Sequence, residues 1–562
     1  MSNVTRYLCA AAYLDSEFRD RVLNELLFDP YRAVPPSYGG FDVMPVLHHC
    51  RRSRAMLVVR DSLITGLLAI GLVINPLGTI SWMLLLVPFA LLTSKRIRRG
   101  PVLLRLLVWI WAGFAILSMI FWLLFLGLFG LASASSAYTY DPITGDIQES
   151  GMSLLVGVSL FGAAFVPLLT LVVALVYRIA IYMTLAGALR PGSPAPSGDS
   201  HPKLGRRLDY ISRAQWGNIT MYADEDAFKG TGVITRSWSI AVELDRVREA
   251  GTARRRDEPV DIDPVALHAF VRDRLVEMRD RVLRPNEGIQ RLDIGDHVVT
   301  RGIFTVADWQ RERVPLAHPL IDKNGLPRFL ATPEEIAAIA RHPQGGVRYY
   351  QRVTINNAGQ EIRDANGNLV APAADQEALT SAFIYLAVEG RMLYTQFVVT
   401  VLPPALGPYH VVDRLPTMTG GRIAWEALKA MRLLLLRDVL AAPARVTRTI
   451  VQAVRQNMMT PDPSKHIVYP YGARHSIREL GASEDLQTYI QVLDVAKYTR
   501  MIEQRLTEAV LDFLEERDVD TGAYRLQAAS VTMNTVAVGA GGTVSGPIAF
   551  GRHASATVNS GT

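Results

Sequence analysis

Two long stretches of this sequence contain no charged side chain, and they limit its fold more than any other feature. Residues 106–131 contain no charge over 26 positions, and residues 153–177 contain none over 25 positions. An α-helix rises about 1.5 Å per residue, so about 20 apolar residues cross the hydrocarbon core of a bilayer. Buried helices of water-soluble proteins seldom lack charge on every face over such a length. Both stretches are therefore predicted to be transmembrane helices.

Two shorter apolar segments precede them, and Asn75-Pro76 lies between the two. Proline lacks an amide donor and disfavours helix at the residue before it, so the chain is expected to turn there. We predict helices over about 56–74 and 77–92, with Arg60 and Asp61 at the level of the lipid headgroups. They form either two short spans or a re-entrant hairpin. Either arrangement returns the chain to the side from which it entered.

The orientation follows from the basic residues near the ends of the apolar segments, which favour the cytoplasmic side. Residues 132–151 contain three carboxylates and no Lys or Arg, so this loop is predicted to lie outside. Both termini are then cytoplasmic and the protein is expected in the plasma membrane, without a cleavable signal peptide. The residues that determine this topology are Arg51, Arg52, Arg54, Lys95, Arg96, Arg98, Arg99 and Arg178.

The remaining sequence is predicted to be a cytoplasmic α+β region. Residues 238–244 alternate apolar and polar side chains, and residues 382–388 and 392–402 read as a hairpin. Further strands are expected over 292–305 and 347–355. Asp263-Pro264 predicts a helix start, and Ser483-Glu484-Asp485 is expected to cap a long helix. Strands and helices do not alternate strictly, which favours α+β over a doubly wound sheet.

The predicted fold class is thus membrane α-helical, with four apolar segments, joined to a cytoplasmic α+β region. An amphipathic helix near the start is expected to be capped by Asp15 or Ser16. The predicted division is an N-terminal cytoplasmic or interfacial segment 1–55, a transmembrane region 56–180, a linker 181–202, the α+β region 203–530 and a tail 531–562.

Residues 423–458 read as a basic amphipathic helix with Pro443 in its middle. One interpretation places this helix on the membrane surface, with its apolar face among the headgroups. Packing against the sheet of its own domain explains the pattern as well, and we favour that interpretation. The residues expected on the basic face are Arg437, Arg445, Arg448 and Arg455, and those on the apolar face are Val446, Ile450, Val451 and Val454.

Motifs of catalysis and cofactor binding are missing from the sequence: there is no GxxxxGK[ST] loop, HExxH, GxSxG or CxxC. We therefore predict no catalytic residue, no cofactor and no metal. Gly230-Thr231-Gly232 lacks the third glycine of a nucleotide loop. Residues 364–368 imitate a calcium loop but are expected to form a hairpin turn. Asp293, Asp296 and His297 are expected on the surface or in a turn.

Three further features bear on partners and compartment. The 59 basic and 53 acidic residues are mixed along the chain, without a basic stripe interleaved with aromatic residues, so no nucleic-acid partner is expected. Cys9 and Cys50 are predicted to be free thiols, and His48-His49-Cys50 is expected to be solvated or interfacial rather than a metal site. Residues 531–562 carry one charge, Arg552. This tail is expected to be disordered, although its short β-prone runs resemble tails through which some bacterial signalling proteins associate.

Several stretches together resemble an uncharacterised family of multi-pass membrane proteins from actinobacteria. They are YLCAAAYLD at residues 7–15, GNITMY at 217–222, AVEGR at 387–391, LPP at 402–404 and VDRLP at 412–416. The resemblance implies membrane residence and a shared cytoplasmic domain. It implies no activity and no catalytic residue.

The predicted function is that of a polytopic plasma-membrane protein presenting a cytoplasmic interaction or assembly domain. Its partners are expected to be the lipid bilayer and either a second copy or a cytoplasmic protein. Alternatives are a signalling protein with a β-aggregating tail, a transporter or oligomeric channel, and a membrane-anchored enzyme with an unrecognised site. Transport is disfavoured because the long spans lack charge and the Asn75-Pro76 break is expected near the outer turn.

Overall fold

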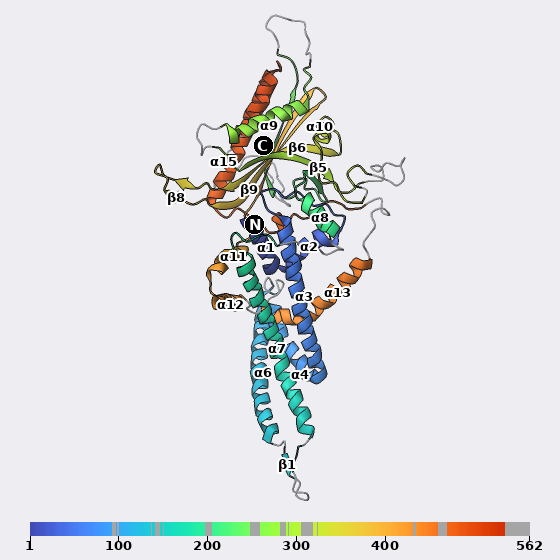
Figure 1. Ribbon diagram of the computed structural model, residues 1–562. Helices are drawn as coiled ribbons and strands as arrows, with labels where there is room; N and C mark the ends of the chain where they lie inside the picture. The colour runs from blue at the N-terminus through green and yellow to red at the C-terminus, as the bar shows by residue number, and fades with distance from the viewer. Residues whose placement is uncertain are drawn as a thin grey trace, which may run out of the picture. The chain divides into compact units, whose positions relative to one another are not determined.

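The chain forms two compact units, each assembled from stretches that are distant in sequence (Figure 1). The α+β unit comprises Met1–His48, Pro194–His410 and Pro461–Thr562, and the helical unit comprises His49–Ser193 and Val411–Thr460. The predicted division into consecutive segments stays a prediction. The computed structural model describes residues 1–92, 97, 100–135, 138–140, 147–149, 151–196, 205–247, 259–281, 288–289, 291–304, 318–322, 324–430, 434–458 and 469–533.

The α+β unit is built on a six-stranded sheet in the order β3-β5-β6-β9-β10-β4. All neighbouring strands are antiparallel except β3 and β5, which are parallel. This mixed sheet with surrounding helices confirms the α+β prediction for the region. The strands are β3 Ile219–Tyr222, β4 Val233–Glu243, β5 Leu292–Arg301, β6 Val347–Ala358, β9 Asp375–Glu389 and β10 Met392–Leu402.

The predicted hairpin is the pair β9–β10, in which Glu389 faces Met392. Gly390 and Arg391 both have positive φ, 58° and 69°, as a two-residue hairpin turn requires. The expected turn at residues 364–368 is also confirmed, since the Asp364 carboxylate accepts from the amides of Asn366 and Asn368. It joins the short strands β7 Ile362–Arg363 and β8 Leu369–Ala371.

Helices α9 Pro264–Asp280, α15 Tyr489–Glu515 and α16 Gly522–Met533 bury their apolar faces with the sheet in one core. Asp263 caps α9, as predicted, by accepting a hydrogen bond from the amide of Val265. The predicted cap of α15 at Ser483 is wrong. The helix begins at Tyr489, because Thr488 and Gln491 form a reciprocal capping box.

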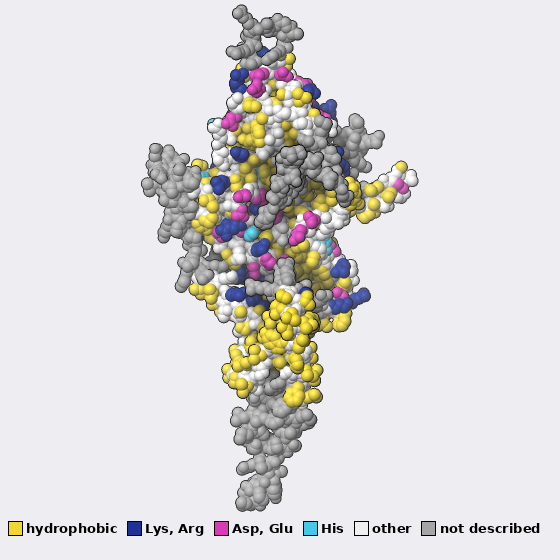
Figure 2. Space-filling model, turned by 180° about the vertical axis from the view of Figure 1, so that it is seen from behind, with side chains coloured by type: hydrophobic (Ala, Val, Ile, Leu, Met, Phe, Trp, Pro, Cys, Tyr) yellow, Lys and Arg dark blue, Asp and Glu magenta, His cyan; other side chains and the backbone are white. Residues whose placement is uncertain are grey.

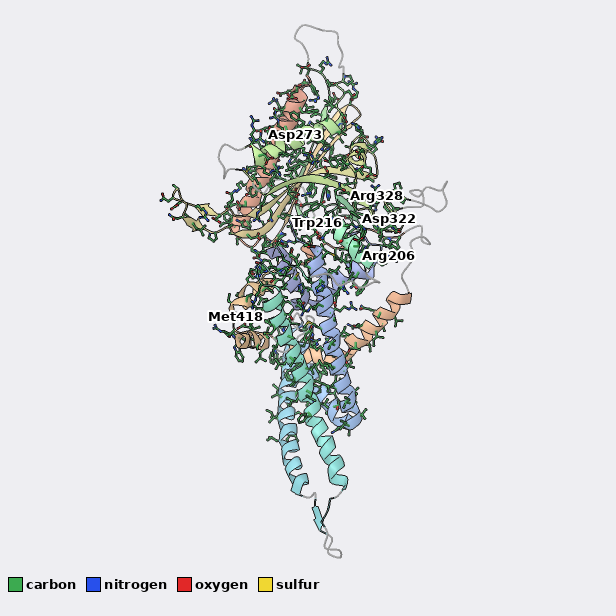
Figure 3. All side chains as sticks on the ribbon, viewed as in Figure 1. Arg206, Trp216, Asp273, Asp322, Arg328 and Met418 are labelled. Carbon is green, nitrogen blue, oxygen red and sulfur yellow. The ribbon has the colours of Figure 1, made fainter. Side chains whose placement is uncertain are left out.

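The N-terminal helices belong to the α+β unit. Asp15 caps α2 Ser16–Leu23, as predicted, and Phe18 and Val22 of that helix are buried. The unit's other helical elements are α1 Asn3–Leu14, the π-helical turn Asn24–Phe28, α8 Gly205–Ala214, α10 Pro333–Ala340, the 3-10 turn Gly407–His410 and α14 Ile477–Leu480. Trp216, just after α8, and Arg328, before α10, are labelled in Figure 3.

The helical unit consists mainly of long apolar helices. Among the described residues, Val43–Ile74 and Phe165–Ala188 are long and apolar enough to cross a membrane, and Pro76–Leu92 and Val102–Ser118 are shorter apolar helices. Helix α3 starts in the α+β unit, well before the predicted start near Met56. The elements are α3 Val43–Ile74, α4 Pro76–Leu92, α6 Val102–Ser135, the pair β1 Tyr138–Tyr140 and β2 Ile147–Glu149, α7 Gly151–Ala188, α11 Val411–Arg414, the 3-10 turn Leu415–Thr417, α12 Gly420–Lys429 and α13 Leu434–Met458.

Apolar side chains are found both inside and outside this bundle. Ile64 of α3, Leu86 of α4 and Ala174 of α7 are buried in a common core. Many others face outward, among them Phe114 and Phe121 of α6 at 67% and 68% exposure. Figure 2 shows such side chains gathered over the described part of these helices. Contiguous exposed apolar surface of this kind marks an interaction with a membrane or another protein.

Candidate membrane-interface site

Four charged side chains meet inside the helical unit and form what we call the ion cluster: Arg60 and Asp61 of α3, and Asp438 and Arg445 of α13. Both guanidinium groups bind the Asp61 carboxylate, Arg60 Nη2 at 2.7 Å and Arg445 Nε at 2.6 Å. Asp438 lies 3.3 Å from Arg60 Nη1, and its backbone carbonyl accepts from Arg445 Nη2 at 2.6 Å. The cluster therefore joins two helices that are distant in sequence, since Arg60 and Asp438 are 378 positions apart.

Because the ion cluster is largely buried, each of its charges needs the opposite charges around it as counterions. Arg60 and Asp61 are only 5% and 2% exposed, whereas Asp438 and Arg445 are 32% and 25% exposed. The Arg60 guanidinium also lies 4.5 Å from the ring centroid of Tyr177 on α7. Two positive and two negative groups balance, so the cluster carries no net charge. Removing one partner from such a group leaves a buried charge without its counterion.

The protonation of Arg445 follows from this geometry. Burial by itself lowers the pKa of the guanidinium, but hydrogen bonds to Asp61 and the charges of Asp61 and Asp438 more than offset it. The net result is a pKa above the ordinary value for arginine. Arg445 is thus held as a cation by the carboxylate it contacts.

The first half of α13 packs within the helical unit. Val439 and Ala442 are buried against Ile64, Leu86 and Ala174 of the helices around them. The favoured interpretation, that residues 423–458 pack against the sheet of the domain, is therefore wrong for this half. Its apolar residues meet other apolar helices, and Arg445, just after Pro443, meets Asp61 instead of solvent.

The second half of α13 exposes an apolar face. Ile450, Val451 and Val454 are 58%, 51% and 47% exposed. Arg448 in this half is also exposed, as is Arg437 in the first half, and Gln452 accepts a hydrogen bond from Arg54 of α3. Of the four predicted basic residues, Arg445 belongs to the ion cluster, and the side chain of Arg455 lies outside the described residues. An exposed apolar face beside an exposed arginine is typical of a helix in the headgroup plane.

Helix α12 has the same two-sided character. Ile423 and Ala427 are buried, and the helix packs against α7. On the other side Trp425 and Leu428 are 56% and 44% exposed. Tryptophan is enriched where membrane meets water, because its ring is amphipathic. Met418, just before α12, is labelled in Figure 3.

The predicted topology residues fall into two groups. Lys95, Arg96, Arg98 and Arg99 lie outside the described residues. The others flank the ion cluster: Arg51, Arg52 and Arg54 precede Arg60 on α3, and Arg178 follows Tyr177 on α7. Because Arg60 contacts Tyr177, both basic groups lie at the same end of the bundle. Arg178 itself lies 5.3 Å from the ring centroid of Tyr182.

His297 is not the surface or turn residue that the sequence indicated. It is fully buried on β5, where Nδ1 lies 2.7 Å from the Tyr38 hydroxyl and Phe228 stacks on its ring. Burial lowers its pKa to about 3, so it is neutral. Of the two neighbouring carboxylates, Asp293 pairs with Arg352 and Asp296 with Arg272.

The glycines at 230 and 232 bind an internal carboxylate. Glu479 of α14 accepts hydrogen bonds from the amides of Gly230 at 2.6 Å and Gly232 at 3.2 Å. Both glycines have positive φ, and a Cβ at Gly232 would lie 2.1 Å from the Val401 carbonyl oxygen. Burial raises the pKa of Glu479 to about 7, with the charge of Asp226 as the second cause.

The expectation that His48-His49-Cys50 is solvated or interfacial is wrong for two of the three residues. His49 and Cys50 are 2% and 0% exposed inside α3. Within the described residues, no group of three or more His, Cys, Asp or Glu side chains is arranged to hold a metal ion.

Sequence reasoning missed the ion cluster, although two signals were present. Asp61 is the last charge before 33 uncharged residues, which places it at a boundary. Asp438 and Arg445 are seven positions apart, so they share one helical face. Neither signal shows that the two segments meet.

The profile of the AbeC-like domain family matches residues 237–545. The matched region includes strands of the sheet and also α12 and α13 of the helical unit. No curated protein and no solved structure match this chain. Since the matched region covers more than half of the 562 residues, the chain belongs to the AbeC-like domain family.

Proposed function

We propose that this chain is a multi-pass plasma-membrane protein with both termini in the cytoplasm, and that its α+β unit acts there as an interaction or assembly domain. In this proposal α6 and α7 cross the bilayer and the ion cluster lies at its cytoplasmic boundary. Helices α12 and α13 lie along the headgroups at that boundary. The bilayer is the first partner, and a second copy or a cytoplasmic protein is the next.

The observation that carries the proposal is a change in the exposed side chains at the level of the ion cluster. On one side of it α3 exposes Leu63, Ile70 and Val73, at 54%, 53% and 85%. On the other side are the basic residues that precede Arg60 and follow Tyr177. Each large apolar side chain gains roughly 1.5–3 kcal/mol on leaving water, so the sum over these helices favours a bilayer.

The positions of α12 and α13 support the surface role. Both expose apolar residues, and the two helices lie at a similar height along the bundle (Figure 1). Trp425 and Val451 would then reach the acyl boundary while Lys429 and Arg448 remain among the headgroups. The family match includes both helices, so this element is part of the region shared by the family.

The interaction role is favoured over an enzyme by what the buried polar groups contact. The buried groups His297, Glu479 and Arg352 all bind other parts of their own unit, Arg352 through the exposed carboxylate of Asp293. The signalling alternative depends on the tail after Met533, which lies outside the described residues.

Cysteine labelling in intact cells tests the topology. Cys9 and Cys50 are buried and are replaced by alanine, and single cysteines are introduced at Thr144 or at Thr447, which is exposed on α13. We expect Thr144→Cys to react with a membrane-impermeant maleimide in intact cells. Thr447→Cys should react only after the membrane is permeabilised. The reverse pattern, or reaction of both in intact cells, would overturn the proposed orientation.

A further inference from the structure

Hydrogen bonds within the connection between α3 and α4 pair several of its polar groups. The Asn75 amide donates to the Gly71 carbonyl at 2.8 Å, and the Asn75 side-chain oxygen accepts from the Gly78 amide at 2.8 Å. The Thr79 hydroxyl donates to the Asn75 carbonyl at 2.9 Å. Pro76 has no amide hydrogen to satisfy. A turn of this kind tolerates an environment without water, where unpaired backbone groups are costly.

The same turn presents apolar side chains at its tip. Val73 and Leu77, on either side of Asn75, are 85% and 80% exposed. No charged residue occurs between Asp61 and Lys95. A turn that projects into water normally carries polar or charged side chains, whereas this one exposes two of the most accessible apolar residues in the described part of the unit.

Contacts along α3 fix the depth of this turn against α7. Arg60 meets Tyr177, and Ile64 shares a core with Ala174. Nearer the turn, Gly71 is so close to α7 that a Cβ there would lie 2.9 Å from Val166. Val166 is near the middle of the uncharged stretch 153–177, so the turn lies about half-way along that stretch.

Helix lengths give the same result. Ile74 is thirteen positions after Asp61, a rise of about 20 Å, against a hydrocarbon core of about 30 Å. Figure 1 shows α6 and α7 continuing well past the turn between α3 and α4. The arms of this hairpin are therefore too short to reach the far ends of the longer helices.

We infer that α3 and α4 form a re-entrant hairpin, which enters the bilayer from the cytoplasmic side and ends within the hydrocarbon core with Val73 and Leu77 against lipid acyl chains. The inference rests on the proposed function. It decides between the two arrangements that the sequence left open. It also places the Asn75-Pro76 break near the middle of the bilayer, where the sequence had indicated the outer turn.

Spin-label depth measurements on the full chain in lipid vesicles test this inference. Nitroxides are attached at Val73→Cys and Leu77→Cys on the background without native cysteines. Leu117→Cys, exposed near the middle of the α6 apolar stretch, serves as the deep control, and Thr144→Cys as the external control. We expect both tip labels to be accessible to oxygen and protected from a water-soluble nickel complex, as at Leu117.

The outcomes separate the inference from the proposed function. If the tip labels are reached by the nickel complex or by an impermeant maleimide from outside, while Leu117 stays protected, the hairpin crosses the bilayer and the inference is wrong. If Leu117 is also reached, the helices do not lie in lipid, and the proposed function fails with it.

A matched pair of lysine substitutions adds a second readout. Val59 and Val73 are both exposed valines of α3, but Val59 adjoins the ion cluster. A lysine at Val59 reaches the headgroups, whereas a lysine at Val73 is held in hydrocarbon. We expect V73K to lower the amount of membrane-inserted protein roughly tenfold or more relative to V59K. Equal amounts of the two variants would contradict the inference.

Discussion

The two units of this chain handle apolar and polar side chains in opposite ways. In the α+β unit, Phe383 and Phe397 are fully buried, whereas in the helical unit Phe114 and Phe121 are mostly exposed. The buried titratable groups differ as well. The α+β unit buries a neutral histidine, His297, and the helical unit buries the Arg60–Asp61 ion pair.

The proposed membrane residence of the helical unit accounts for this contrast, because the two units would then fold in different solvents. Water drives the apolar residues of the sheet into a single core and tolerates charge on its surface. Lipid would give no such drive, so helices placed in it could expose apolar residues and would keep their charges paired at one level. The following variants would break or sharpen this comparison, beginning with the largest expected effect.

The largest effect is expected for Asp61→Ala. Two guanidinium groups share this carboxylate, so its loss leaves Arg60 buried beside Arg445 without a counterion. We expect a destabilisation of about 3–5 kcal/mol. Thermal unfolding of the full chain in detergent micelles measures it. Asp438→Ala is the control, because that carboxylate is 32% exposed and should cost less than half as much. Equal losses of stability in the two variants would contradict the central role of Asp61 in the ion cluster.

The next effect concerns the carboxyl buried in the α+β unit. The pKa of Glu479 is about 7 in the folded chain, against about 4.3 when unfolded, so the folded state binds the proton more tightly. Stability therefore falls as pH rises between these values and stays reduced above pH 7. Glu479→Gln removes this dependence. We expect the variant to gain about 2–3 kcal/mol over the natural chain between pH 5 and pH 8.

Denaturant unfolding of both chains at the two pH values measures the difference. A constant difference across this range would show that Glu479 ionises as an ordinary carboxyl. A loss for the variant that grows with pH would reverse the sign and contradict the burial argument.

A smaller effect is expected at the edge of the sheet. The Gln527 side chain of α16 donates to the Ala241 carbonyl at 2.9 Å and accepts from the Ala241 amide at 3.3 Å, so it replaces a neighbouring strand on β4. Gln527→Ala should cost about 1–2 kcal/mol and increase self-association, because an exposed edge invites pairing. Leu526→Ala, 75% exposed on the same helix, is the control. Equal stability and light scattering of the two variants would contradict this role.

The smallest effect is expected on the outer half of α13. A polarity-sensitive fluorophore at Val451→Cys should shift to shorter wavelength when the chain is reconstituted into anionic vesicles, because this face enters the headgroup layer. The same label at Thr447→Cys should shift less. A greater shift at Thr447 would place the other face of the helix on the membrane.

Local features of the α+β unit could be predicted from the sequence because their signals are local. The alternation around Trp238, the cap at Asp263 and the β9–β10 hairpin are each encoded within a few residues. The start of α15 was placed too early because Ser483 and Thr488 both suit an N-cap. Only Thr488 is followed three positions later by a glutamine that completes the capping box.

The candidate site was harder to predict because it depends on contacts distant in sequence. A periodic pattern identified α13 as amphipathic, but it could not show that Arg445 binds Asp61. His297 was misplaced for the same reason, since its partner Tyr38 is 259 residues away. Helix α3 was expected to start near Met56, because the basic residues before it obscure a helix that begins at Val43.

Alkaline carbonate extraction of membranes from cells that make the full chain tests the central claim most directly. Carbonate releases proteins held at the surface but not helices that lie in the hydrocarbon core. We predict that the chain stays in the membrane pellet, together with a known integral protein. Release of the chain into the supernatant would contradict it, since the exposed apolar residues of α3, α4, α6 and α7 would then not be in contact with lipid.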